Sequence, residues 1–142
     1  NGFRYTKRSR IDDRDIATLR DTGVILVDVI GELASLYSVC DIAIIGGSFS
    51  GRGGHNPLEP AFWGKPILCG DDMSNFPFID EFYKNEAAIR TSEYNLYNDL
   101  KRLLLSEDER TEMGKRAMKL CREKAGAIMR SIEILESYLK LS

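Results

Sequence analysis

Three apolar runs of four residues punctuate the first half of the chain, and each is followed by a glycine or an aspartate. Short runs without polar alternation are typical of strands that are buried on both faces of a parallel sheet. We therefore predict strands at 24–27, 41–45 and 66–69, with a weaker fourth strand at 87–90. A further short strand is expected at 3–9.

Helical spacing of apolar residues separates these strands. Leu33, Leu36, Tyr37 and Cys40 follow Gly31-Glu32 at helical intervals, and further helices are expected at 57–63, closed by Gly64, and at 76–84. Strand, helix and strand in this order require a parallel sheet with a right-handed crossover. The charged stretch 10–22 is read either as a short surface helix stopped by Gly23 or as a loop.

After residue 90 the pattern changes to helices only. One apolar stripe begins at Leu96, and Ser106 with Glu109 has the spacing of a capping box that opens a second helix. A last helix is expected at 126–140. The fold class predicted is α/β, with a Rossmann-like parallel sheet flanked by helices and a helical C-terminal tail, in one domain over residues 1–142.

Composition narrows the function classes. The 142 residues carry a net charge of −2, which argues against nucleic-acid binding, and no apolar run reaches the about 20 residues that cross a bilayer. Three cysteines far apart are read as reduced core residues. A single histidine excludes a His-rich metal site. Because Asn1 follows no methionine, we expect a piece of a longer protein.

The stretch after the second strand contains the candidate chemistry. Gly46, Gly47 and Ser48 follow the strand at once, and Gly51, Gly53 and Gly54 come shortly after. A strand, a glycine-rich loop and a helix start are the parts of an anion site, because glycines let backbone N–H groups approach a phosphate closely. An ordinary strand-to-helix turn is the alternative.

Four segments together resemble one family. GELASLY (31–37), DIAIIGGSF (41–49), GGHNPLEP (53–60) and SNF (74–76) are similar in order and spacing to the C-terminal domain of the bacterial Kdo transferases. These GT-B glycosyltransferases move 3-deoxy-D-manno-octulosonic acid (Kdo) from CMP-Kdo to lipid A precursors in lipopolysaccharide biosynthesis. The match covers about residues 28–80.

The resemblance implies a division of labour. CMP-Kdo is the expected donor, with no cofactor and no metal, and this chain is expected to be the donor-binding part of a two-domain enzyme. The catalytic base and the lipid A precursor site are expected on an N-terminal domain, so we expect no catalytic residue in this chain and no turnover by it alone. The implied location is the bacterial cytoplasm, at the cytoplasmic face of the inner membrane, with membrane contact only through the full-length protein.

Glu59 has two interpretations. Asn56 and Glu59 have N-cap and N3 spacing, which suggests a purely structural cap. Pro60 argues against that register, because it would stand where the helix needs an N–H. A later helix start places Glu59 in the first turn with its carboxylate pointing outward, and the resemblance implies that it binds the ribose hydroxyls.

The neighbouring polar residues are also ambiguous. By resemblance, Gly46, Gly47, Ser48, Gly54, His55 and Asn56 hold the donor phosphate, with the Ser48 hydroxyl added to the backbone N–H groups. His55 is either a donor to the phosphate or to the Kdo carboxylate, or a loop residue with a satisfied ring. Arg52 is either a cationic partner of the donor or a solvated loop arginine.

Three further cleft residues are expected, Glu32, Ser74 and Asn75, although a position in the first turn of a helix would explain Glu32 by itself. Gly70-Asp71-Asp72 departs from the Gly-Pro-His that is common in the family. We interpret the two acids as solvated or N-capping residues. The alternative functions are a GT-B enzyme or epimerase that uses a UDP-sugar, and a non-catalytic nucleotide-binding module.

Overall fold

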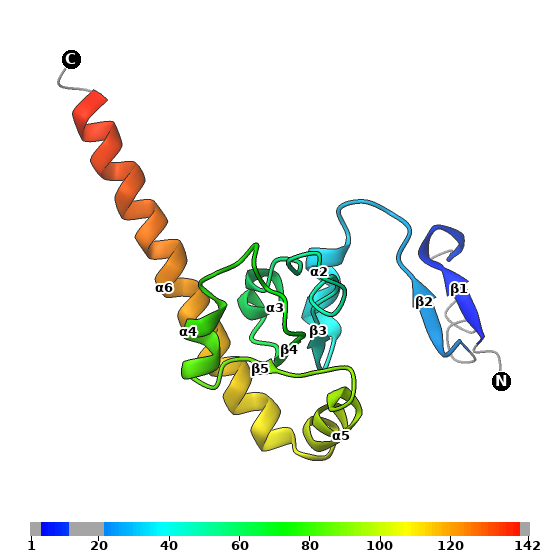
Figure 1. Cartoon of the computed structure of the whole chain (residues 1–142). Helices are drawn as coiled ribbons and strands as arrows, with labels where there is room; N and C mark the ends of the chain where they lie inside the picture. Colours follow the sequence, from blue (N-terminus) through cyan, green and yellow to red (C-terminus); the bar gives the residue numbers. More distant parts are fainter. Residues whose placement is uncertain (1–3, 12–21, 140–142) are drawn as a thin grey trace. The chain divides into compact units, whose positions relative to one another are not determined.

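The structure is a computed structural model that describes residues 4–11 and 22–139, and only the backbone of residues 127–139. The chain divides into two compact units, residues 1–36 and residues 37–142. Each unit is described by itself below, with the element labels of Figure 1. The helix or loop expected at 10–22 lies almost entirely outside the described residues.

The first unit contains a two-stranded parallel sheet. Strand β1 (Tyr5–Lys7) pairs with β2 (Val24–Leu26), and a short 3-10 helix, η1 (Arg8–Arg10), follows β1 directly. The β2 strand is confirmed, but its side chains are 44–48% exposed, so the prediction of a buried strand is wrong. A sheet of two strands offers little surface against which such side chains can be buried.

Two hydrogen bonds join the residues that follow the strands of this sheet. The N–H and the hydroxyl of Ser9 both donate to the carboxylate of Asp28, over 2.9 and 2.8 Å. These bonds lower the pKa of Asp28. The helix expected to begin near Gly31 is present only as α2 (Leu33–Leu36) in this unit.

The second unit is built on a three-stranded parallel sheet. Its order is β3 (Ala43–Ile44), β4 (Ile67–Cys69) and β5 (Ile89–Arg90), with Ala43 opposite Ile67 and Leu68 opposite Ile89. The ladder extends one residue beyond two of the strands, because Ile45 N donates to Leu68 O and Thr91 N to Cys69 O. The parallel arrangement predicted from the apolar runs is confirmed.

Helices cover both faces of this sheet. They are α3 (Leu58–Phe62), α4 (Ile79–Lys84), α5 (Leu96–Leu105) and α6 (Glu107–Leu139), preceded by a 3-10 turn, η2 (Tyr37–Val39). One core cluster joins Ile67 and Cys69 of β4 to α3, α4 and α6, and a second joins Leu68 to Leu103 and Met113. Neighbouring β4 side chains therefore point to opposite, covered faces, and the α/β class is confirmed.

Helix α6 differs from the prediction. It runs as one 33-residue helix through Gly126 (Figure 1), so a separate helix beginning there is wrong. A single glycine costs a helix only about 1 kcal/mol, and this stretch has no proline to end it. The predicted capping box is half present: Glu109 N donates to Ser106 Oγ over 3.3 Å, while the Glu109 carboxylate pairs with Arg102.

Helix α3 ends as predicted at Gly64, which has a φ of 63°. Lys65 N donates to Pro60 O and Gly64 N donates to Ala61 O, the two bonds of a Schellman motif. Gly114 of α6 meets this end so closely that a Cβ on Gly114 would lie 1.9 Å from Gly64 O. The absence of a side chain at Gly114 therefore lets α6 cross α3, the helix that contains Glu59.

Candidate donor site at the carboxyl edge of the sheet

The candidate site is the loop that joins β3 to α3, residues 46–56, called the glycine loop below. It follows the carboxyl end of β3, which is where parallel sheets bind ligands. Gly47, Gly51, Gly53 and Gly54 have φ values between 67° and 77°. Residues that have a Cβ rarely adopt these positive φ values, so the backbone path of the loop depends on glycine at these four positions.

The two ends of the loop lie side by side. His55 N donates to Gly46 O over 3.0 Å, and Arg52 N donates to Gly47 O over 3.2 Å. A Cβ on Gly46 would lie 3.2 Å from Cδ2 of the exposed His55 ring. The structure therefore brings Gly46, Gly47 and His55 together.

Three backbone N–H groups of this loop have no acceptor among the described residues. Within the part of the chain that the structure describes, the N–H groups of Gly46, Gly47 and Gly54 donate to no other group. Such N–H groups on a glycine backbone form a concave surface that favours an anion. Helix α3 has only five residues, so its dipole is weak. The affinity of this loop for an anion would therefore come from these N–H groups and not from the helix.

Ser48 has a different role from the one predicted for its hydroxyl. The residue is 1% exposed, its Oγ donates to Ile45 O over 2.6 Å, and the same Oγ accepts from Gly70 N over 2.8 Å. The hydroxyl therefore ties the end of β3 to the end of β4. The side chain is therefore not free to bind a phosphate.

The start of α3 decides the register of Glu59. Pro57 is the N-cap and Leu58 is the first helical residue, so Pro60 stands in the first turn, where no N–H is needed. Asn56 Oδ1 accepts from Leu58 N over 3.0 Å. The later helix start is confirmed, and Glu59 is partly exposed in the first turn. Burial, with the Glu59 charge as a second cause, raises the pKa of Tyr37.

The remaining predicted residues fall in three places. Arg52 is exposed, and its guanidinium makes no ion pair with any described residue. Ser74 and Asn75 belong to the loop after β4, residues 70–76, called the β4 loop below. Glu32 belongs to the first unit, where its Oε2 lies 2.8 Å from Arg8 Nε in an ion pair.

Sequence reasoning missed the role of Asp72. Its Oδ2 accepts from Gly53 N over 2.7 Å and its Oδ1 accepts from Ser74 N over 3.2 Å. Hydrogen bonds from Ser74 and from Gly53 N lower the pKa of this carboxyl. The bond to Ser74 closes an Asx turn within the β4 loop, where no helix begins, so Asp72 is neither the solvated nor the N-capping residue that we expected. The bond to Gly53 spans 19 residues and has no signature in the sequence.

A pocket of about 430 Å³ opens at the same sheet edge. It is lined by Ser48, Phe49 and Gly51 of the glycine loop, by Asp71 and Asp72, and by residues 92–94 after β5. The loops after all three strands therefore contribute to it. Phe49 and Tyr94 add aromatic surface that the sequence analysis did not single out.

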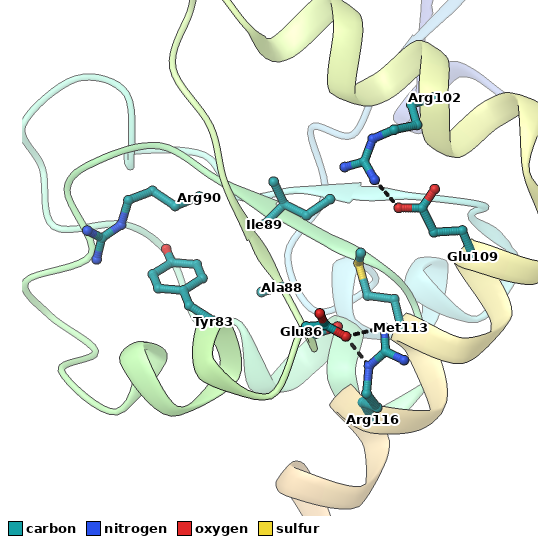
Figure 2. A pocket seen from close by; sticks show the side chains of 9 residues that line it. All are labelled: Tyr83, Glu86, Ala88, Ile89, Arg90, Arg102, Glu109, Met113 and Arg116. Atoms are coloured by element: carbon teal, nitrogen blue, oxygen red, sulfur yellow. Dashed lines mark hydrogen bonds and ion pairs between the residues drawn. The ribbon is translucent and has the colours of Figure 1, made fainter.

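Figure 2 shows a second pocket, of about 450 Å³, between α4, β5, α5 and the start of α6. Its three arginines are each paired with a carboxylate: Arg90 with Asp80, Arg102 with Glu109, and Arg116 with Glu86. The pairing offsets the positive charge that would attract a phosphate. None of the predicted donor-site residues lines this pocket.

The chain was compared with known proteins. A 3-deoxy-D-manno-octulosonic acid transferase of Haemophilus influenzae is 34% identical over 123 residues, which is 84% of this chain. Enzymes of the same name from Bordetella pertussis and Rickettsia conorii are each 33% identical, over 82% and 88% of this chain. This chain is related to the Kdo transferases. It spans 27–29% of the length of these three relatives. No family model matches the chain.

A solved structure agrees with the sequence relatives. The C-terminal CMP-Kdo binding domain of WaaA from Acinetobacter baumannii superposes with a TM-score of 0.69 at 26% identity, over 82% of this chain and 60% of that chain. The resemblance to the C-terminal domain of the Kdo transferases, first seen in GGHNPLEP, is therefore confirmed. The match also confirms the predicted fold, that of the C-terminal half of a GT-B glycosyltransferase.

The described residues form neither a metal-binding cluster nor a membrane-spanning helix. In residues 4–11 and 22–139 no three His, Cys, Asp or Glu side chains gather in a way that could hold a metal ion. No helix in the same part of the chain is both long and apolar enough to cross a membrane.

Proposed function

We propose that this chain is the donor-binding part of a Kdo transferase and binds CMP-Kdo at the glycine loop. The observation that carries the proposal is the group of unused N–H donors at Gly46, Gly47 and Gly54, in the loop that leads into the helix of Glu59, in a chain related to Kdo transferases. The loop has the donors that a phosphate needs, and Glu59 has the acceptor that ribose hydroxyls need.

Each group has a separate task in this proposal. The three N–H groups and the exposed His55 ring contact the phosphate, with Arg52 as a further cation beside it. Glu59 accepts hydrogen bonds from both ribose hydroxyls. Negative charge develops on CMP as the glycosidic bond breaks, and donors fixed in advance lower the barrier by stabilising that charge.

The rest of the reaction is assigned to the full-length protein. We propose that it transfers Kdo to a lipid A precursor in lipopolysaccharide biosynthesis, with the catalytic carboxylate and the acceptor site in its N-terminal domain. It would act in the bacterial cytoplasm at the inner membrane, which it would contact outside this chain. The single domain predicted for residues 1–142 also remains a proposal.

Titration calorimetry with CMP and UMP tests the donor. We expect weak CMP binding by the 142-residue chain and weaker UMP binding. Glu59→Gln keeps the shape but replaces a charged acceptor, and hydrogen bonds to charged groups contribute about 1.5–3 kcal/mol. CMP affinity should therefore fall about tenfold to a hundredfold.

The control variant is Glu123→Gln, an equal charge change at an exposed position of α6. It should leave CMP affinity unchanged. If Glu59 is only a structural residue of α3, Glu59→Gln will lower the melting temperature and leave CMP affinity unaltered. Preference for UMP would favour a UDP-sugar enzyme.

A further inference from the structure

The glycine loop is fastened to the β4 loop by the side chain of Asp72. One carboxylate oxygen of Asp72 accepts from Gly53 N in the glycine loop, and the other accepts from Ser74 N in the β4 loop. The backbone adds a third bond, from Asp72 N to Ser48 O over 3.0 Å. The carboxylate thus bridges two segments, and each oxygen has its own partner.

Asn75 holds the same loop from the other side. Its Nδ2 donates to Arg52 O over 3.0 Å and lies 3.4 Å from Gly54 O, and its N–H donates to Gly53 O over 3.1 Å. Three consecutive residues of the glycine loop, 52–54, are therefore bound by two side chains of the β4 loop.

The β4 loop packs so closely against Gly53 and Gly54 that neither position can accommodate a side chain. A Cβ on Gly53 would lie 2.5 Å from Cγ of Asn75, and a Cβ on Gly54 would lie 2.3 Å from Sδ of the buried Met73. Both glycines also have positive φ. The conformation of residues 53 and 54 is thus determined by where Asp72 and Asn75 hold them.

We infer that Asp72 is a positioning residue for the donor, acting through Gly53 to hold the N–H of Gly54 and the His55 ring beside Gly46. This inference rests on the function proposed above. Asn75 has the same role, in place of the donor contact that the sequence analysis expected for it. Ordering the loop before the donor arrives lowers the entropy lost on binding.

Asp71 provides a matched comparison. It is adjacent to Asp72, bears the same charge and lines the same pocket, but it is exposed and its carboxylate bonds to no described residue. Removing either charge near an anionic donor should strengthen binding slightly, by Coulomb's law. Only removal of the Asp72 carboxylate also releases Gly53, so positioning and charge predict opposite signs for Asp72→Asn.

The experiment compares Asp72→Asn, Asp71→Asn and the unaltered 142-residue chain. The N–H groups of Gly53 and Ser74 face different carboxylate oxygens, and asparagine has an NH2 group in place of one of them, so it cannot keep both bonds in this geometry. The bond that remains is to a neutral amide oxygen, which is a weaker acceptor than a carboxylate. We expect the amide hydrogen of Gly53 to exchange faster in Asp72→Asn without nucleotide, and CMP affinity to fall roughly tenfold. Asp71→Asn should change neither the exchange rate nor, except for a slight strengthening, the CMP affinity.

A double-mutant cycle of Asp72→Asn with Asn75→Ala provides the second readout, and its Asn75→Ala arm remains available by itself if Asp72→Asn folds poorly. Asn75→Ala should also weaken CMP binding, and because both residues hold one loop, the double variant should lose less than the product of the two single losses. Multiplicative losses would mean that Asn75 contacts the donor directly, which overturns its positioning role.

The outcomes separate this inference from the proposed function. Equal CMP affinities of Asp72→Asn and Asp71→Asn, while the unaltered chain binds CMP, would overturn the positioning role alone. An unchanged exchange rate of Gly53 in Asp72→Asn would overturn it as well. Absence of CMP binding by the unaltered chain would overturn the proposed function and the positioning role together.

Discussion

Replacement of Gly114 by alanine tests the link between the helical packing and the donor site. Gly114 lies in α6, where helix propensity favours alanine over glycine by about 1 kcal/mol. From propensity alone, Gly114→Ala should stabilise the chain. The structure predicts the opposite sign, because the new Cβ would lie 1.9 Å from Gly64 O and 2.7 Å from Gly64 C.

The magnitude follows from the size of this overlap. Ordinary van der Waals contact begins at 3.4 Å, so the backbones of α6 and Gly64 must separate by about 1.5 Å. Gly64 O is a backbone atom and cannot rotate away. Overpacking typically costs about 1–3 kcal/mol, and an obstructing backbone places this site at the upper end. After the propensity gain, we expect a net loss of about 2 kcal/mol.

Urea unfolding of the 142-residue chain measures the change. Thr111→Ala, an exposed position of α6 three residues earlier, is the control and should be neutral or slightly stabilising. Because α3 contains Glu59, Gly114→Ala should also weaken CMP binding by the folded chain. A gain in stability from Gly114→Ala would refute the close crossing of α3 and α6.

Three other perturbations test separate parts of the structure. Glu86 follows α4 with a φ of 51°, so Glu86→Gly should raise the free energy of unfolding by about 1 kcal/mol, whereas a loss would show that its exposed ion pair with Arg116 matters more. The folded-state pKa of Asp72 is lowered below the ordinary value of 3.8, so its contribution to stability is present at neutral pH and is lost as the pH falls below 3.8 and through the folded-state pKa. The stability difference between the unaltered chain and Asp72→Asn should shrink over that acidic range, and a difference that is constant with pH would contradict this. EDTA should not change CMP affinity, and loss of binding that magnesium restores would identify Asp71 and Asp72 as metal ligands.

The parallel sheet of the second unit was predictable because the sequence of each strand contains a local signature. The runs that include 42–45 and 66–69 are apolar without alternation, and Gly46 and Gly70 end them. Proline was equally informative at α3. A ring at Pro60 is compatible with the first turn only, so the sequence alone placed the helix start after Asn56.

Other features depended on distant partners and could not be derived from local patterns. The hydroxyl of Ser48 was expected to face a phosphate, but Gly70 N, 22 residues away, binds it. Helix α6 passes Gly126 because the cost of one glycine is small beside that of ending a long helix. The exposure of β2 depends on how many strands its sheet has, which no apolar run reveals.

The arrangement of the candidate donor site could be predicted for some of its residues and not for others. Gly46, Gly47, Gly54 and His55 come together as the glycine pattern and the family resemblance suggested. The bond between Asp72 and Gly53 joins two loops that fold against each other, so neither spacing nor composition indicates it. The departure of Asp71-Asp72 from the family pattern was the only signal at that position.

A titration of the isotope-labelled 142-residue chain with CMP, followed by amide chemical shifts, tests the central claim most directly. The glycine loop and Glu59 are predicted to contact CMP, so shifts should cluster at 46–48 and 54–59, with smaller ones at Gly53 and in the β4 loop. Shifts confined to α5 and α6, or no shifts at millimolar CMP, would contradict a donor site at this sheet edge.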